Sequence, residues 1–166
     1  MLRTVAIAVA TALLFMAVAS AQPGGDLRAT LQARYDALKT AMHAHDDRGM
    51  QAVLAPRFQS VDVRGQVGMT SEMIAEVDAL PADPNRTSGT TIDSVVANNG
   101  IATVEQHYSM HTTRADAGDR SQTIELSARS TDTWVLRQGV WLLQQSVTHE
   151  MTMSRDGRVV QHLSHP

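Results

Sequence analysis

The stretch from Arg129 to Met153 alternates between apolar and polar positions on both sides of Gln138-Gly139. Alternation with a period of two is typical of a β-strand with one buried face, so this stretch predicts a long β-hairpin that turns at Gln138-Gly139. The face expected to be buried, extended back to Leu126, consists of Leu126, Ala128, Ser130, Asp132, Trp134, Leu136, Trp141, Leu143, Gln145, Val147, His149 and Met151.

Three members of this face carry side chains that suit a pocket better than a core: Asp132, Gln145 and His149. A carboxylate that faces an apolar layer costs several kcal/mol unless it is paired, hydrogen-bonded or protonated. Chains that keep such groups usually line a wet cavity or a ligand site with them. The hairpin therefore predicts a binding pocket on this face.

Three helices are expected before the hairpin. The first follows the breaker Gly24-Gly25-Asp26, and its apolar stripe recurs at intervals of three and four. That stripe consists of Leu27, Leu31, Tyr35, Leu38, Met42 and His45. A short second helix, capped by Asp46 or Asp47, must end at Pro56. A third helix is expected from Thr70 or Ser71 through Val77, ended by Pro81 and Pro84.

The remaining segments predict strands at residues 57–64, 90–97, 101–113 and 158–163. Turns are expected at Gly65-Gln66, at Asn98-Asn99-Gly100 and at Asp156-Gly157, with a loop over residues 114–121. Helices followed by a run of antiparallel strands indicate an α+β fold with helices packed on one face of a curved sheet. One helical layer covers a strongly curved sheet incompletely, so a conical cavity is expected between the layers.

The first 21 residues predict a secretory signal peptide. Arg3 provides the positive start, residues 5–18 are apolar, and Ala19-Ser20-Ala21 is a cleavage site of the small-x-small type. We therefore expect cleavage near Ala21, a periplasmic or secreted location, and one mature domain over residues 22–166.

The charge balance argues against two classes of partner. The whole chain has 14 Lys or Arg against 17 Asp or Glu, and the expected leader contains one of the basic residues. Neither nucleic acid nor an anionic membrane is therefore an expected partner. Cysteine is absent, which excludes disulfides and thiolate chemistry.

Several motifs resemble the nuclear transport factor 2-like superfamily, and more narrowly its small exported SnoaL-like members. These motifs are Ala44-His45-Asp46, residues 50–54, Ala55-Pro56-Arg57-Phe58, Val61-Asp62, Gly65, Thr131-Asp132-Thr133-Trp134 and Gly139-Val140-Trp141-Leu142. The resemblance implies a cone-shaped fold. It leaves activity open, because one fold hosts many functions.

The pocket partly resembles that of ketosteroid isomerase. The resemblance places the general base at Asp62 and an oxyanion-hole aspartic acid at Asp132. The tyrosine of that family falls on Leu38, while Tyr35 lies one turn earlier. Two carboxylates near one dry cavity cannot both ionise cheaply, so Asp132 is the expected neutral one.

Each of these residues also has a structural interpretation. Asp62 could be a solvated turn carboxylate ahead of Gly65, and Asp132 could be satisfied by a hydrogen bond to Gln145. His149 could move protons with Asp132 or Asp62, or could be a hydrogen-bonded core histidine.

No metal or cofactor is expected. His107 and His111 share a strand face but would lie about 13 Å apart, too far to bind one ion together.

The opposite sheet face is polar and poor in lysine, which fits a solvated surface or a wet homodimer interface. It is expected to carry Thr103, Glu105, His107, Ser109, Ser127, Arg129, Thr131, Thr133, Gln144, Ser146 and Thr148. The resemblance favours a homodimer through this face.

Two functions remain open. The first is an exported domain that binds a small apolar molecule in a conical pocket. Catalytic candidates are Asp62, Asp132 and His149, and ligand contacts are expected from Tyr35, Leu38, Tyr108, Trp134 and Gln145. Any chemistry would be acid/base and independent of a cofactor, of the isomerase, dehydratase or hydrolase type. The second is a non-catalytic secreted dimeric module that recognises a protein partner.

Overall fold

Three helices and two short strands open the fold, which is known from a computed structural model that describes residues 24–81, 83–115 and 120–164. Helix α1 spans Gly24–His43, α2 spans Asp47–Val53 and α3 spans Thr70–Ala79. Strands β1 (Leu54–Val61) and β2 (Val67–Met69) lie between α2 and α3. The three predicted helices are confirmed. The expected signal peptide, residues 1–21, lies outside the described residues.

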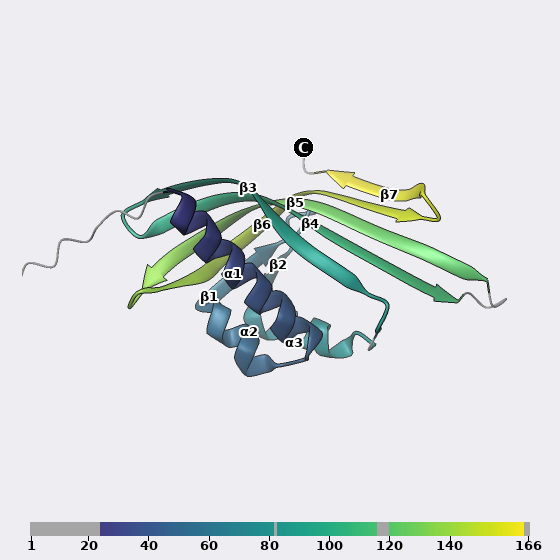
Figure 1. Cartoon of the computed structure of the whole chain (residues 1–166), viewed down its shortest axis with the longest axis horizontal. Helices are drawn as coiled ribbons and strands as arrows, with labels where there is room; N and C mark the ends of the chain where they lie inside the picture. Colours follow the sequence, from purple (N-terminus) through teal and green to yellow (C-terminus); the bar gives the residue numbers. More distant parts are fainter. Residues whose placement is uncertain (1–23, 82, 116–119, 165–166) are drawn as a thin grey trace, which may run out of the picture.

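Five further strands complete one seven-stranded sheet: β3 (Thr87–Asn98), β4 (Ile101–Ala115), β5 (Ser121–Arg137), β6 (Val140–Arg155) and β7 (Arg158–Ser164). The strand order is β2-β1-β6-β5-β4-β3, and β7 pairs with the edge of β6 that β1 leaves free. All pairs are antiparallel except β1 with β6. The helices cover one face of this curved sheet, and the far ends of β4 to β7 extend beyond them (Figure 1). The α+β prediction is confirmed.

Three tight turns fix the order of the long strands. Each places two successive residues at positive φ, as a two-residue hairpin turn of the type I′ requires. The pairs are Asn99-Gly100 at 50° and 76°, Gln138-Gly139 at 51° and 81°, and Asp156-Gly157 at 50° and 74°. All three turns were predicted from the sequence.

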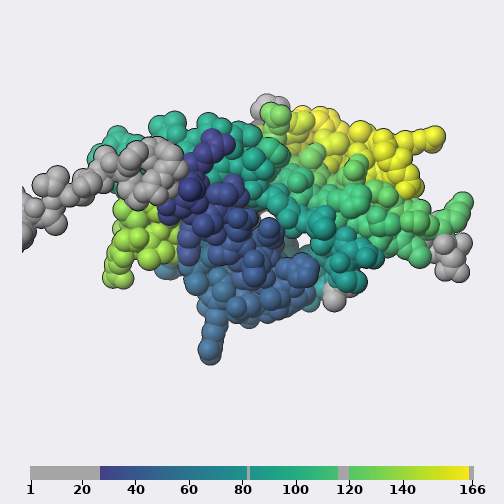
Figure 2. All heavy atoms as spheres, in the orientation of Figure 1, coloured from purple at the N-terminus to yellow at the C-terminus, as the bar shows by residue number. Residues whose placement is uncertain are grey.

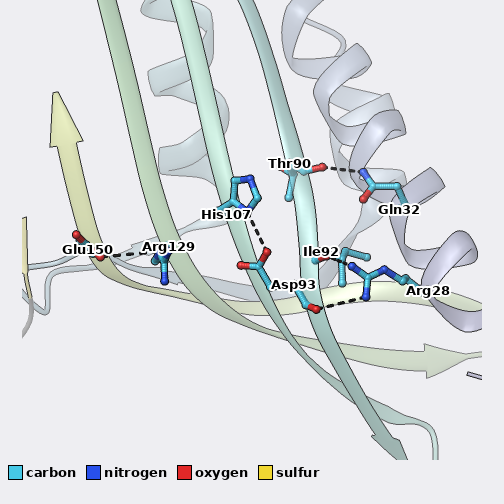
Figure 3. A network of polar contacts seen from close by, with 8 residues as sticks. All are labelled: Arg28, Gln32, Thr90, Ile92, Asp93, His107, Arg129 and Glu150. Carbon is cyan, nitrogen blue, oxygen red and sulfur yellow. Dashed lines mark hydrogen bonds and ion pairs between the residues drawn. The ribbon is translucent and has the colours of Figure 1, made fainter. Parts of the chain in front are cut away.

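Helix α1 protects the open edge of the sheet. Among the described residues, strand β3 has no strand neighbour beyond it, so its outward carbonyl groups need other donors. Arg28 donates to the carbonyl oxygens of Ile92 and Asp93, and Gln32 donates to that of Thr90 at 2.8 Å (Figure 3). These bonds hold α1 along β3 and set the position of its next turn, which carries Tyr35.

The core lies between α1 and the face of the sheet that the helices cover, here called the inner face. Its main cluster joins Leu27, Leu31, Tyr35, Val53, Leu54, Phe58, Ile92, Ala102, Val104, Trp134, Trp141 and Leu143. A smaller cluster of Ala41, Met50, Ile74 and Val77 holds α2 and α3 together. No helix among the described residues is long and apolar enough to cross a membrane.

Candidate functional site

Two β-bulges in β6 change which residues face the core. The pairing register shifts between Thr133 and Trp134, which are opposite Gln145 and Leu143, so Gln144 is an extra residue. A second shift leaves His149 unpaired. An extra residue reverses the alternation of all following side chains. Ser146 and Thr148 consequently lie on the inner face, opposite Asp132 and Ser130.

The predicted positions of Gln145 and His149 are therefore wrong. Gln145 is paired with Thr133 on the opposite face of the sheet, which we call the outer face. His149 is exposed, and its Nε2 lies 2.6 Å from the hydroxyl of Thr131, which donates to Glu105. Neither residue contacts Asp132. Strict alternation assigned these residues to the wrong face because no sequence signal predicts the bulge at Gln144.

Asp132 itself lies on the inner face and forms a buried network with Tyr35 and Trp134. The hydroxyl of Tyr35 donates to Oδ2 of Asp132 at 2.6 Å, and Nε1 of Trp134 donates to the tyrosine oxygen at 3.0 Å. The two rings meet edge to face with their centroids 4.9 Å apart. All three side chains are at most 5% exposed. Helix α1 and strand β5 thus bring together three of the predicted site residues.

Burial raises the pKa of two groups in this network, the carboxyl group of Asp132 and the hydroxyl group of Tyr35. It raises the pKa of Asp132 to about 6, although hydrogen-bonding interactions with Ser146, Tyr35 and Gln106 favour the charged form. The negative charge of Glu105 also raises the pKa of Asp132. Burial and the adjacent Asp132 raise the pKa of Tyr35, so the tyrosine keeps its proton. A carboxyl that ionises near pH 6 can exchange protons in either direction near neutral pH.

Two oxygen atoms of this site lack a partner with hydrogen-bond geometry among the described residues, although Ser146 and Gln106 lie close enough to Asp132 to favour its charged form. The two atoms are Oδ1 of Asp132 and Oε1 of Gln106, which lies on the neighbouring strand β4. Buried polar atoms are nearly always satisfied in folded proteins, so each of these two acceptors can take a further donor, such as a water molecule or a ligand. The sequence interpretation missed Gln106, although its place in the alternation of residues 101–113 puts it on the same face as Val104.

Asp62 does not join this network. It follows the last residue of β1, and its Oδ1 accepts hydrogen bonds from the backbone N–H groups of Arg64 and Gln66, each at 2.8 Å. No described hydrogen bond or ion pair connects it to Asp132. The structure therefore gives Asp62 the role of a turn carboxylate, which was one of the two interpretations of the sequence.

The other two predicted ligand contacts lie beside the network. Leu38 is half-buried one turn after Tyr35 and packs against both hydrophobic clusters. Tyr108 is half-buried on β4, two residues beyond Gln106 on the inner face. Small openings separate α1 from strand β3, as Figure 2 shows on the helical side of the molecule.

Two hollows lie away from this network. One of about 500 Å³ is formed by α2, β1 and the start of α3, around Leu54, Pro56 and Ile74. Another of about 530 Å³ lies at the far ends of β3 to β6. Neither contains Tyr35 or Asp132, so the expected conical pocket is not one of these hollows. The described residues contain no cluster of three or more His, Cys, Asp or Glu side chains that could hold a metal ion.

The outer face carries an ordered set of polar groups. A row of small residues crosses four strands, in which Gly89, Ser109, Ser127 and Thr152 are direct neighbours and line the 530 Å³ groove. Ion pairs flank this row on both sides. Two of them, which Figure 3 shows, join His107 to Asp93 at 3.0 Å and Glu150 to Arg129 at 4.0 Å. The others join His111 to Glu125 at 3.7 Å and Glu150 to His162 at 3.9 Å.

The sequence matches no protein-family model and no curated protein. Solved structures do resemble it. The hexachlorocyclohexane dehydrochlorinase LinA-type3 from Novosphingobium barchaimii gives a TM-score of 0.59 at 12% identity, over 84% of this chain and 90% of that one. A candidate dehydratase of the NTF2-like family from Streptomyces avermitilis gives 0.57 at 12% identity, over 76% and 97%.

A third structure, the association domain of CaMKII from C. elegans, gives a TM-score of 0.56 at 13% identity, over 75% of this chain and 96% of that one. These relatives share the helical layer and the curled antiparallel sheet at low sequence identity. The chain therefore has the fold of the nuclear transport factor 2-like superfamily.

Proposed function

We propose that the mature chain binds a small, largely apolar molecule against the buried carboxyl of Asp132, and that this carboxyl exchanges a proton with the bound molecule. The observation that carries the proposal is the state of Asp132. One oxygen is fixed by Tyr35, while the other is buried and unpaired. A carboxyl held in this way presents one oriented oxygen to whatever enters the site.

The acidity of Asp132 supports acid/base chemistry. Its pKa of about 6 allows it to donate a proton in mild acid and to accept one above neutral pH. Two similarly folded proteins are named as a dehydrochlorinase and a candidate dehydratase, names that denote elimination reactions. For this chain we propose proton transfer without a cofactor, and we assign it to the exported SnoaL-like type on the basis of the leader motif ending at Ala21.

Native mass spectrometry tests this proposal. The wild-type protein, purified from its own host, is expected to carry a small-molecule adduct that Asp132→Asn loses. Glu76→Gln removes one charge from an exposed position of α3 and should keep the adduct. An adduct retained equally by the Asp132→Asn variant, or wild-type protein without any adduct, would argue against the proposal.

A second proposal concerns the outer face, which we infer pairs with a second copy of the chain. The row of small residues leaves a shallow groove between flanking ion pairs, and such a surface can meet its own copy with water-filled polar contacts. A similarly folded chain is named an association domain. A secreted module that recognises a protein partner would use the same face.

Ser127→Arg tests the outer-face pairing. Ser127 is exposed at the centre of the row, so a long charged side chain there should prevent two faces from meeting. We expect sedimentation equilibrium at tens of micromolar protein to change from dimer to monomer. Ala75→Arg, on the exposed side of α3, serves as the control and should remain dimeric. A wild-type monomer, or a dimeric Ser127→Arg variant, would contradict this assignment.

A further inference from the structure

The direction of the hydrogen bonds around Asp132 determines what the site can offer a ligand. Trp134 donates to Tyr35, and Tyr35 donates to Asp132 Oδ2, so the tyrosine hydrogen is already used inside the protein. The buried atoms that lack a partner with hydrogen-bond geometry among the described residues are two acceptors, Oδ1 of Asp132 and Oε1 of Gln106. A ligand that completes these contacts must therefore bring hydrogen atoms.

The charge of the site narrows the choice of donor. No described ion pair connects Asp132 to a lysine, arginine or histidine, and the charged residue that acts on it, Glu105, is negative. A buried carboxylate without a cation is costly, and an incoming positive charge offsets that cost. A hydroxyl group has one hydrogen atom to donate, whereas an alkylammonium group has three and carries the missing charge.

Resting on the proposed small-molecule function, we propose that the ligand of this site is an amine: an apolar body with a protonated amino group that donates to Asp132 Oδ1 and Gln106 Oε1. The side chain of Gln106 lies close enough to the same carboxyl to favour its charged form, so both residues belong to one site. In the empty site, a proton on Asp132 can serve the same two oxygens. Binding of the ammonium group then releases that proton to solvent, so the charge of the site stays balanced.

This exchange makes affinity depend on pH in a defined direction. The titratable groups that act on Asp132 are Tyr35 on α1, which stays protonated, and Glu105, which lies on the outer face of β4. With a pKa of about 6, Asp132 is mostly protonated at pH 5 and mostly ionised at pH 7. Because an alkylamine remains charged over this range, its affinity should be about tenfold weaker at pH 5 than at pH 7.

A matched series of cyclohexylamine, cyclohexanol and cyclohexanone tests the inference on the full mature protein. Calorimetry measures affinity, and the indole N–H resonance of Trp134 reports binding at the network. We expect the amine to bind at least tenfold more tightly than the other two at pH 7. We also expect Asp132→Asn to remove this preference and Glu76→Gln to keep it.

The possible outcomes separate this inference from the proposed function. Tighter binding of cyclohexanone, with affinity that increases toward pH 5, would overturn the amine inference and show that protonated Asp132 donates to a carbonyl group. The proposed function would stand in that case. No binding of any of the three compounds at millimolar concentration, together with wild-type protein that carries no adduct, would overturn both.

Discussion

Replacing Asp132 by asparagine is expected to raise the free energy of unfolding at pH 8 by about 3 kcal/mol, because the raised pKa of this buried carboxyl makes its ionised form costly. The folded state binds the proton more tightly than the unfolded state. The stability due to this proton is therefore fully present below the ordinary pKa of 3.8 and is lost as pH rises through about 6. Asparagine cannot ionise, and its amide can donate to Gln106 Oε1.

Urea unfolding followed by circular dichroism at pH 3.5, 4, 5, 6, 7 and 8 measures this difference. The wild-type curve should lose stability relative to Asp132→Asn between pH 4 and 7, and the two proteins should differ little at pH 3.5. Glu76→Gln controls for the removal of one negative charge at an exposed site. A variant that is less stable than the wild type at pH 8 would mean that the charged carboxylate is compensated in the folded state.

Local signals were sufficient to predict most of the fold. The pairs Asn99-Gly100 and Asp156-Gly157 adopt the positive φ values that their residue types favour, so these hairpins could be located from the sequence. Strand β1 was predicted less accurately. It begins at Leu54 rather than Arg57, and its register with β6 shifts between Leu54 and Gln59, which accommodates Pro56. The parallel pairing of β1 with β6 has no local signal, because it depends on tertiary contacts.

The predicted sheet face of the candidate site residues was confirmed only where the alternation is unbroken. Strand β5 runs without a bulge of its own, and Asp132 and Trp134 face the core as expected. Strand β6 contains two bulges, and each reverses the face of the residues that follow it. Gln145 and His149 were therefore assigned to the wrong face. A bulge depends on the match between two strands, and one strand read alone does not reveal it.

The missing tyrosine of the isomerase comparison has a geometric explanation. The family position falls on Leu38, but the hydroxyl that reaches Asp132 belongs to Tyr35, one turn earlier on the same helix stripe. Residues three or four positions apart share a helix face, so a small shift of α1 along the sheet exchanges their roles. The hydrogen bonds of Arg28 and Gln32 to β3 set the position of α1 along the sheet. They are tertiary contacts, which cannot be predicted from the local sequence.

Trp134 is the second position where a large effect is expected. It is completely buried, it packs against Tyr35, and its ring nitrogen supports the tyrosine hydroxyl. Trp134→Ala should therefore cost about 3–5 kcal/mol of unfolding free energy, as large-to-small core replacements do. Trp134→Phe keeps most of the ring but leaves the tyrosine oxygen without its donor, which adds about 1 kcal/mol to the packing loss.

Trp141→Phe is the matched control, because Trp141 is buried in the same cluster without a described hydrogen bond from its ring nitrogen. The comparison also has a readout that packing alone would not change. Donation from Trp134 polarises the Tyr35 hydroxyl and strengthens its bond to Asp132, since linked hydrogen bonds reinforce one another. Trp134→Phe should therefore move the pKa of Asp132 further upward, seen as a higher midpoint in the pH dependence of stability, while Trp141→Phe leaves that midpoint unchanged. Equal midpoints in the two variants would mean that Trp134 only fills space, and that Tyr35 alone determines how strongly Asp132 holds its proton.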